Sequence, residues 1–237
     1  YAMLLFAVCA VSGGCASRHP FSVDIRNPWL GPMRVAVAPA LNYSGSADFD
    51  PFAVADLMAS ELAAVQGFEV LPVSRTLAVL SRQGTAFVES PAHAQEVREA
   101  LGADAVLVFA ITEYNPYEPP VVGITAQLYG GKPGAQVAGI DPVRIARSAA
   151  PVSRGVPRTA NVPLAQVATV RNAAHDPVIR EVQDYAQARD GGESPYGWRK
   201  YVVSQQSYLR FCCHAAIKEL VQCGVVGNLP ETPEQTG

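Results

Sequence analysis

Residues 105–111 read Ala-Val-Leu-Val-Phe-Ala-Ile, an unbroken run of seven apolar side chains. A half-exposed strand alternates apolar and polar side chains, whereas an apolar run of this length, bounded by turn signals, is typical of a strand buried on both faces. Such a strand lies at the centre of a sheet that has helices on each side. This stretch therefore predicts an α/β fold, and the segments around it predict the rest of the sheet.

Four further strands are expected around this central one. Residues 121–129 alternate between apolar and polar side chains after a turn at residues 114–120, which predicts a half-buried antiparallel partner. Upstream, residues 34–39 and 68–72 predict two short strands, and residues 162–170 predict a last one. The side chains that share one face of this last strand are Val162, Leu164, Gln166, Ala168 and Val170.

Helices are expected between these strands, each with a recognisable start or stop. Asp50-Pro51 places a capping side chain before a proline at the first helical position, ahead of a helix over residues 52–65. Ser74 is expected to cap a second helix, and Gly102 to end a third over residues 91–101. Asp176 starts a fourth, and the longest helix is expected over residues 196–223.

The order of these elements resembles the periplasmic lipoprotein superfamily that includes CsgG, the N-terminal domain of TolB and LpoB, an activator of penicillin-binding proteins. The resemblance runs from residue 33 to residue 129 and rests on four stretches, VAVAPALNYSG, GFEVLPVSRTLAVL, LGADAVLVFAITEY and VGITAQLY. It implies an anticodon-binding-domain-like mixed sheet flanked by helices. It also implies an envelope assembly module without catalysis.

The N-terminus carries the features of an export signal. Residues 1–11 contain no charge, form a run too short to span a bilayer, and are followed by Ser12-Gly13-Gly14-Cys15. Small residues before a cysteine resemble the lipobox of bacterial lipoproteins, which implies lipid attachment at Cys15, although Ser12 stands where that pattern prefers Leu. The alternatives are a plain secretory signal cut near residues 16–17 and a buried strand of a cytosolic domain. We expect a signal peptide over residues 1–14 and a tether over residues 15–32.

Residues 130–160 depart from the rest of the expected domain. This segment is rich in Gly and Pro and is expected to be a flexible insertion in a single α/β domain that spans residues 33–223. Against the single Asp141 it carries five basic side chains, which are Lys132, Arg144, Arg147, Arg154 and Arg158. They are candidates for contact with anionic lipid or an acidic partner. The alternatives are a solvated excursion and an extension of the hairpin.

The search for chemistry finds few candidates. Cys212-Cys213-His214 has unsuitable spacing for zinc, so buried free thiols or a disulfide that involves Cys223 are expected, and no metal or cofactor is predicted. Small-ligand binding at residues 43–46, after the first strand, and an acid–base pair of His175 with Asp176 are weaker interpretations. Four aromatic side chains are expected either to pack in the core or to form an exposed contact patch. They are Tyr196, Trp198, Tyr201 and Tyr208.

Composition narrows the function. With 49% apolar residues the chain of 237 residues can bury a sizeable core, and a net charge of −3 argues against nucleic-acid binding. We therefore expect a non-enzymatic lipoprotein, anchored at the periplasmic face of a bacterial membrane, with the outer membrane favoured. It would bind an envelope protein to assemble or regulate a cell-surface machine. The alternative is a self-assembling subunit of a CsgG-like secretion channel or ring, so homo-oligomer formation is left open. Residues 224–237 are expected to form a free tail.

Overall fold

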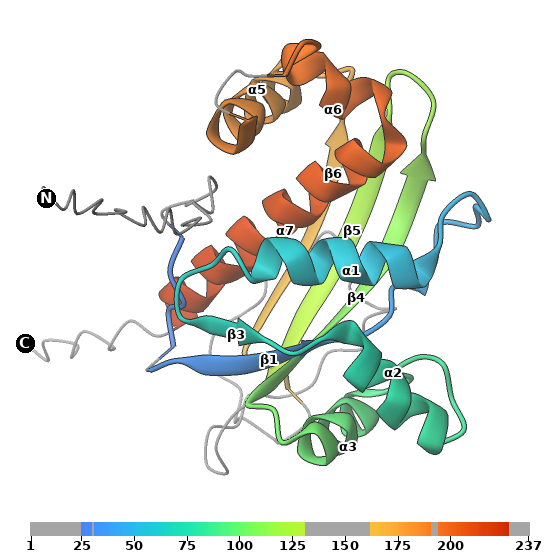
Figure 1. Ribbon diagram of the computed structural model, residues 1–237, viewed down its shortest axis with the longest axis vertical. Coiled ribbons are helices and arrows are strands. Elements are labelled where there is room, and N and C mark those ends of the chain that lie inside the picture. The colour runs from blue at the N-terminus through green and yellow to red at the C-terminus, as the bar shows by residue number, and fades with distance from the viewer. Residues whose placement is uncertain (1–24, 30, 131–161, 191–193, 228–237) are drawn as a thin grey trace, which may run out of the picture.

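The computed structural model describes residues 25–29, 31–130, 162–190 and 194–227. They form a mixed sheet with helices on both faces (Figure 1). The signal segment and Cys15, the basic residues of the 130–160 segment and the tail beyond residue 227 all lie outside these ranges. No helix in the described part is both long enough and apolar enough to cross a membrane.

The sheet has the path β3-β1-β4-β5-β6, and β2 pairs with β4 beside it. The strands are β1 (Met33–Val37), β2 (Leu41–Asn42), β3 (Phe68–Val70), β4 (Ala105–Asn115), β5 (Val121–Gly130) and β6 (Ala165–Asn172). β1 is parallel to β3 and β4, whereas β5 is antiparallel to both of its neighbours, β4 and β6. The mixed α/β sheet, the central strand and the antiparallel hairpin are thus as predicted. The expectation that residues 121–129 are half-buried is wrong, because β5 lies between β4 and β6 and its second face, with Thr125 and Gln127, is buried as well.

Helices cover the two faces unequally. They are α1 (Pro51–Leu62), α2 (Val73–Arg82), α3 (Pro91–Leu101), α5 (Asp176–Asp190), α6 (Lys200–Val203) and α7 (Gln205–Gly227), with the 3₁₀ turn η1 (Gly197–Arg199). The larger core lies beneath α1, α5, α6 and α7, and a smaller one lies beneath α2 and α3. In β4, Leu107 and Phe109 face the larger core while Val106 faces the smaller one, so the predicted burial of both faces is confirmed.

Two of the predicted helix caps are present and one is wrong. Asp50 Oδ1 accepts a hydrogen bond of 2.8 Å from the Phe52 amide at the start of α1, and Gly102 ends α3 with a φ of 60°. Ser74, in contrast, lies inside α2, because the helix begins at Val73, directly after Pro72, with no side-chain cap. The fixed φ of proline favours a helical start at this point without a capping hydroxyl.

The predicted long C-terminal helix is interrupted. Ser204 adopts extended backbone between α6 and α7, and its hydroxyl accepts a hydrogen bond of 3.3 Å from the Ser207 amide. A serine that caps a helix in this way breaks the helix before it, because its side chain satisfies a backbone donor at a helix start. α7 then continues through Gly227, four residues beyond the predicted end at Cys223, so the first residues of the predicted tail are helical.

The predicted tether also ends earlier than expected, because its last part belongs to the folded domain. The Gln66 amide donates to the Ile25 carbonyl at 3.0 Å, and Ile25 and Trp29 pack against the larger core. A side chain on Gly224 of α7 would approach the Trp29 ring to 2.6 Å, so glycine is required for this contact. The last predicted strand is shifted as well: β6 covers residues 165–172 rather than 162–170.

Candidate functional site

Helix α1 carries two carboxylates with opposite surroundings. Glu61 lies in the larger core with a fully buried side chain, whereas Asp56 is exposed on the side of α1 that faces α2. Residues five apart on an α-helix lie on different sides of it, so one helix can serve two environments.

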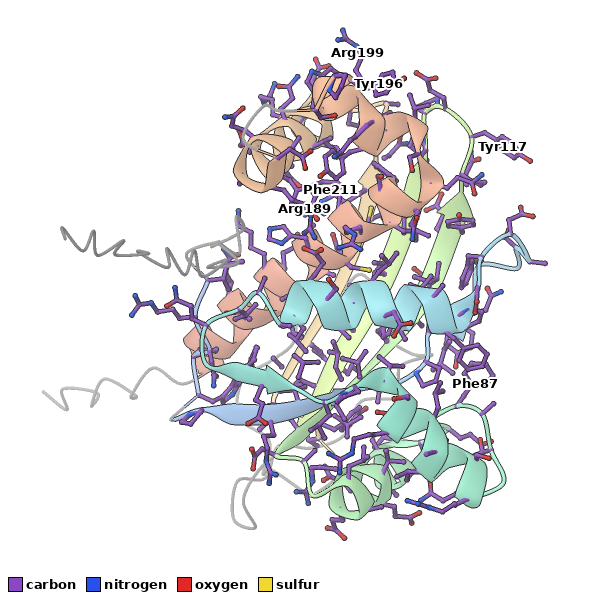
Figure 2. The ribbon with its side chains drawn as sticks, in the orientation of Figure 1. Phe87, Tyr117, Arg189, Tyr196, Arg199 and Phe211 are labelled. Carbon is purple, nitrogen blue, oxygen red and sulfur yellow. The ribbon has the colours of Figure 1, made fainter. Side chains whose placement is uncertain are left out.

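Glu61 is held by two arginines and a histidine from two other helices. Arg189 Nη1 of α5 lies 2.6 Å from Glu61 Oε1, Arg210 Nη1 of α7 lies 3.4 Å from the same atom, and His214 Nδ1 lies 3.6 Å from Oε2. We call Glu61, Arg189, Arg210 and His214 the Glu61 cluster. Figure 2 shows Arg189 pointing from α5 toward α7 near Phe211. Because a buried carboxylate needs compensating charge, these contacts join α1, α5 and α7.

Helical spacing brings this cluster together. Glu61 follows Leu57 and Met58 by four and three residues, so it shares their buried face of α1. Arg210 and His214 are four residues apart on α7, as are Tyr185 and Arg189 on α5, and each pair therefore points to one side of its helix. The sequence analysis missed Glu61 and both arginines, although a charged residue within an apolar helical stripe was a usable signal.

Tyr185 forms the aromatic floor of the cluster. Its ring contacts the rings of Tyr201, Phe211 and His214 at centroid distances of 5.1, 5.7 and 4.8 Å, and its hydroxyl accepts from Arg189 Nη1 at 3.0 Å. Burial, and secondarily the charge of Glu61, raises the pKa of Tyr185 well above its usual value. The α1–α2 groove and the small cavity beside Tyr43, both described below, are lined by other residues, and the contacts of the cluster position three helices.

A second ionic group supports the same layer of helices. Arg171, near the end of β6, donates to Glu181 of α5 at 2.7 Å and also to Glu219 of α7. The Tyr208 hydroxyl donates to the Arg171 carbonyl at 3.0 Å. Arg171 therefore links β6, α5 and α7, and neither it nor the carboxylates Glu181 and Glu219 had been singled out in the sequence.

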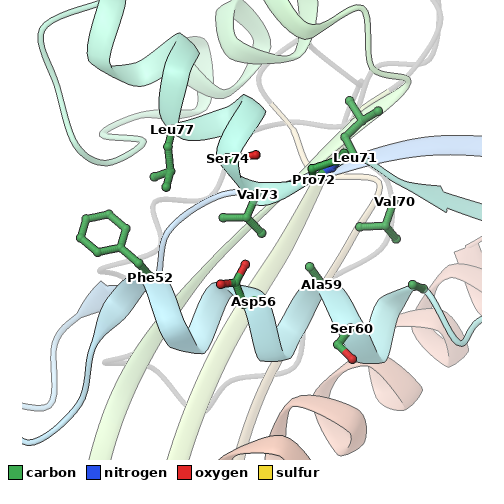
Figure 3. Close-up of a pocket in the computed structure, with 11 residues that line it drawn as sticks. Phe52, Asp56, Ala59, Ser60, Val70, Leu71, Pro72, Val73, Ser74 and Leu77 are labelled. Carbon is green, nitrogen blue, oxygen red and sulfur yellow. The ribbon is translucent and has the colours of Figure 1, made fainter.

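The other side of α1 borders an open groove of about 470 Å³. We call it the α1–α2 groove, and Figure 3 shows Asp56 pointing into it toward Val73. The residues that line it are Phe52, Asp56, Ala59, Ser60, Ala63, Val70, Leu71, Pro72, Val73, Ser74 and Leu77. Asp56 is the one charged residue in this set, and most of the others present carbon to the groove.

The residues of α1 that line the groove differ in size. On α1 the small residues Ala59, Ser60 and Ala63 leave room beside β3, while Phe52 closes the far end. Phe52 is 41% exposed and stacks on Phe87 with ring centroids 6.3 Å apart. An exposed aromatic ring beside apolar walls is a common feature of protein-binding surfaces.

The loop over residues 43–46, the candidate ligand site, follows β2. Asn42 Nδ2 donates to the Ser46 carbonyl at 2.6 Å, and the Ser44 hydroxyl donates to Asn42 Oδ1 at 2.9 Å, so the loop satisfies much of its own polarity. Beside it, a cavity of about 20 Å³ is lined in part by Tyr43 and Thr125. A cavity of this volume holds about one water molecule.

The other predicted candidates are dispersed. His175 and Asp176 are both exposed at the start of α5, and no described group of three His, Cys, Asp or Glu side chains suits a metal ion. Cys212 and Cys213 are buried free thiols whose pKa burial raises, and Cys223 is an exposed free thiol. Tyr201 and Tyr208 are buried, whereas Tyr196 is 76% exposed beside Arg199 (Figure 2).

No protein-family model matches the sequence, and no curated protein matches it. Similar solved structures include lipoprotein GNA1162 from Neisseria meningitidis, which is 18% identical with a TM-score of 0.40 over 60% of this chain and 81% of that chain. The LpoB C-terminal domain from Salmonella enterica is 13% identical with a TM-score of 0.37 over 44% and 76%. A PelC dodecamer structure from Paraburkholderia phytofirmans is 23% identical with a TM-score of 0.28 over 42% and 62%.

Each of these likenesses covers part of this chain and part of the matched structure.

Proposed function

We propose that the chain is a non-enzymatic lipoprotein of the bacterial envelope that binds another protein and thereby helps to assemble or regulate a cell-surface machine. The observation that carries this proposal is the position of the α1–α2 groove relative to the N-terminal segment. The backbone of Arg26 forms an isolated parallel β-bridge with Gln66, which lies just after α1. The chain therefore enters the folded domain near the C-terminal end of that helix. Phe52 and the far end of the groove lie at its other end, about 18 Å away along 12 residues.

This arrangement suits a tethered binding protein. Lipid at Cys15 holds the entry side toward the membrane, where two or three acyl chains give firm anchoring at about 0.8 kcal/mol per buried CH₂. The end of the groove at Phe52 then lies away from the point of attachment and is accessible to a partner. The outer membrane is the proposed location, with the folded domain in the periplasm.

The absence of catalysis is part of the proposal. Among the described residues, the most concentrated group of acidic and basic side chains is the Glu61 cluster, which lines neither cavity. The α1–α2 groove offers one carboxylate without a second titratable side chain in its lining. Acid–base and nucleophilic mechanisms need at least a second positioned group.

Mass spectrometry of the mature N-terminus tests the anchor. The full chain produced in a bacterial envelope is expected to start at Cys15 with a diacylglycerol on its thiol, and Cys15→Ala is expected to be recovered outside the membrane fraction. An unmodified N-terminus at Ala16 or beyond would end the lipoprotein proposal. Crosslinking of the intact envelope, followed by recovery of the chain, tests whether a protein partner is bound.

We also propose that the basic residues of the 130–160 segment contact anionic lipid or an acidic partner. These residues are Lys132, Arg144, Arg147, Arg154 and Arg158. Attraction to anionic headgroups contributes about 1 kcal/mol per basic side chain near a surface. Replacement of all five by Gln should weaken sedimentation with vesicles of phosphatidylglycerol and leave binding to neutral phosphatidylcholine vesicles unchanged. Equal binding of both proteins to the anionic vesicles would leave an acidic protein partner as the target of this segment.

The second candidate function, a self-assembling ring or channel subunit, is favoured by one observation. β6 is the last strand on the path of the described sheet and has eight residues, with Val170 53% exposed. A long edge strand can pair with a second chain. Measurement of the particle mass in detergent decides between the two candidate functions. A large symmetric oligomer would favour the ring or channel subunit over the protein-binding lipoprotein.

A further inference from the structure

The α1–α2 groove lies beside an edge of β3 with which no described strand pairs; residues 25–27 pair with Gln66, just before this strand. β3 lies at the end of the sheet opposite β6 and, among the described strands, pairs only with β1. The Leu71 amide donates to the Val35 carbonyl of β1 at 2.8 Å. Because successive residues of a strand direct their backbone groups to opposite sides, the backbone N–H and C=O of Val70 point away from β1. Val70 also lines the groove.

The groove is shaped to receive the side chains of a strand added at this edge. α1 runs alongside β3 on one face of the sheet (Figure 1), and Val70 and Phe68 project to that face with Val35 and Met33, their partners in β1. An added strand would place every second side chain on the same face, beneath α1. The small side chains of Ala59 and Ala63 leave the space that such side chains need.

The charge in the groove selects the partner's chemistry. Asp56 forms no ion pair or hydrogen bond with another side chain in the part of the chain that the structure describes. The nearest aromatic wall, Phe52, is one turn away, a rise of about 6 Å. Alternate side chains of an extended strand are about 6.6 Å apart, which is close to the spacing of Phe52 and Asp56 along α1. A bound strand that places an apolar side chain against Phe52 therefore places the side chain two residues away against Asp56.

From these observations we infer that the α1–α2 groove binds an extended segment of the partner protein. The segment pairs its backbone with the outer edge of β3 at Val70 and presents an apolar side chain to Phe52 with a Lys or Arg two residues away at Asp56. Main-chain pairing supplies part of the affinity, and the two side chains supply specificity. This inference rests on the proposed function and specifies the class of partner.

An array of decapeptides tests the inference. Each peptide contains an apolar residue and a Lys two positions later within varied polar sequence, and a matched array has Glu in place of Lys. The purified chain from residue 16 onward, which lacks the lipid, is expected to bind members of the Lys array and not their Glu counterparts. Binding of the selected peptide, measured by fluorescence anisotropy, should weaken at least tenfold in Asp56→Asn.

Two further variants and one structural measurement complete the test. Ala63→Trp fills the groove and should abolish binding, whereas Asp184→Asn, an exposed carboxylate on α5, should bind as the unaltered chain does. Hydrogen exchange at the Val70 amide should slow at least tenfold when the peptide is bound. Circular dichroism and thermal unfolding confirm that each variant is folded.

Several results would overturn the inference. These are an array without binders, binding that Asp56→Asn does not alter, and binding in helical form without protection of Val70. If the unaltered chain is nevertheless crosslinked to a partner in the intact envelope, the groove inference fails and the proposed function stands. If the chain is recovered alone, the proposed function fails.

Discussion

The two sides of helix α1 place a carboxylate in opposite situations. Glu61 has a fully buried side chain with Arg189 and Arg210 on one oxygen, while Asp56 faces an open groove without a side-chain partner among the described residues. A buried charge is retained where its loss would leave other charges uncompensated, and an exposed charge is free to meet a partner's charge. The comparison therefore separates a residue that fixes the fold from a residue that can recognise another molecule.

The largest expected effect comes from Glu61→Gln. This change keeps the size of the side chain but leaves Arg189 and Arg210 without their shared counter-charge, which costs about 3 kcal/mol for buried ion pairs. The free energy of unfolding, measured by urea denaturation, should fall by that amount. Glu96→Gln, at an exposed position on α3, is the matched control and should change the free energy by less than about 0.5 kcal/mol. A loss in Glu61→Gln no greater than in the control would contradict the structural role.

The two arginines of the cluster should differ in importance. Arg189 lies 2.6 Å from Glu61 Oε1 and also donates to the Tyr185 hydroxyl, whereas Arg210 lies 3.4 Å away. Arg189→Met should therefore cost about 2 kcal/mol and Arg210→Met less than about 1 kcal/mol of unfolding free energy. The same urea experiment measures both, and a larger loss in Arg210→Met would show that Arg210, rather than Arg189, is the main counter-charge of Glu61.

Alkaline pH should act on the buried side of α1 through Tyr185. Burial raises the pKa of Tyr185 in the folded protein, while the unfolded chain ionises near its ordinary value of about 10. Above that pH the folded state holds a proton that the unfolded state has released, so stability falls as pH rises, by at most about 1.4 kcal/mol per pH unit for this group. Urea midpoints at pH 8, 10 and 11 should show this loss, and Tyr185→Phe should make it shallower. Equal slopes would exclude Tyr185 as its source.

The smallest effect on stability is expected from a substitution on the side of α1 that faces the α1–α2 groove. Asp56→Asn removes an exposed charge that no described side chain pairs with, so the unfolding free energy should change by less than about 0.5 kcal/mol. A loss above about 1 kcal/mol would mean that Asp56 also supports the fold, and the contrast with Glu61 would disappear.

Local patterns predicted the elements of the fold well. The apolar run 105–111 identified the doubly buried β4, and Asp50 and Gly102 marked helix ends because capping depends on neighbouring residues alone. The start of α5 at Asp176 was also predicted. The N-terminal segment was interpreted as a tether because Pro28, Gly31 and Pro32 are loop residues, whereas Trp29 contacts Gly224 far along the chain.

The candidate site was not predictable in the same way. The partners of Glu61 are 128 and 149 residues away in the chain, and a single sequence does not reveal which helices meet. The α1–α2 groove arises from the approach of two helices and a strand edge, with small side chains that carry no local pattern. Sequence reasoning placed the contact surface instead at Lys132, Arg144, Arg147, Arg154 and Arg158, which stay a prediction because they lie outside the described residues.

Site-specific photocrosslinking in the intact envelope tests the central claim most directly. A photoreactive residue at Ser74, in the α1–α2 groove, is compared with one at Gln183, an exposed position on α5. We expect one discrete protein adduct from position 74, none from position 183, and loss of the adduct when Asp56→Asn is added. No adduct from position 74, or the same adducts from both positions, would contradict the account of a lipid-anchored protein that binds its partner in this groove.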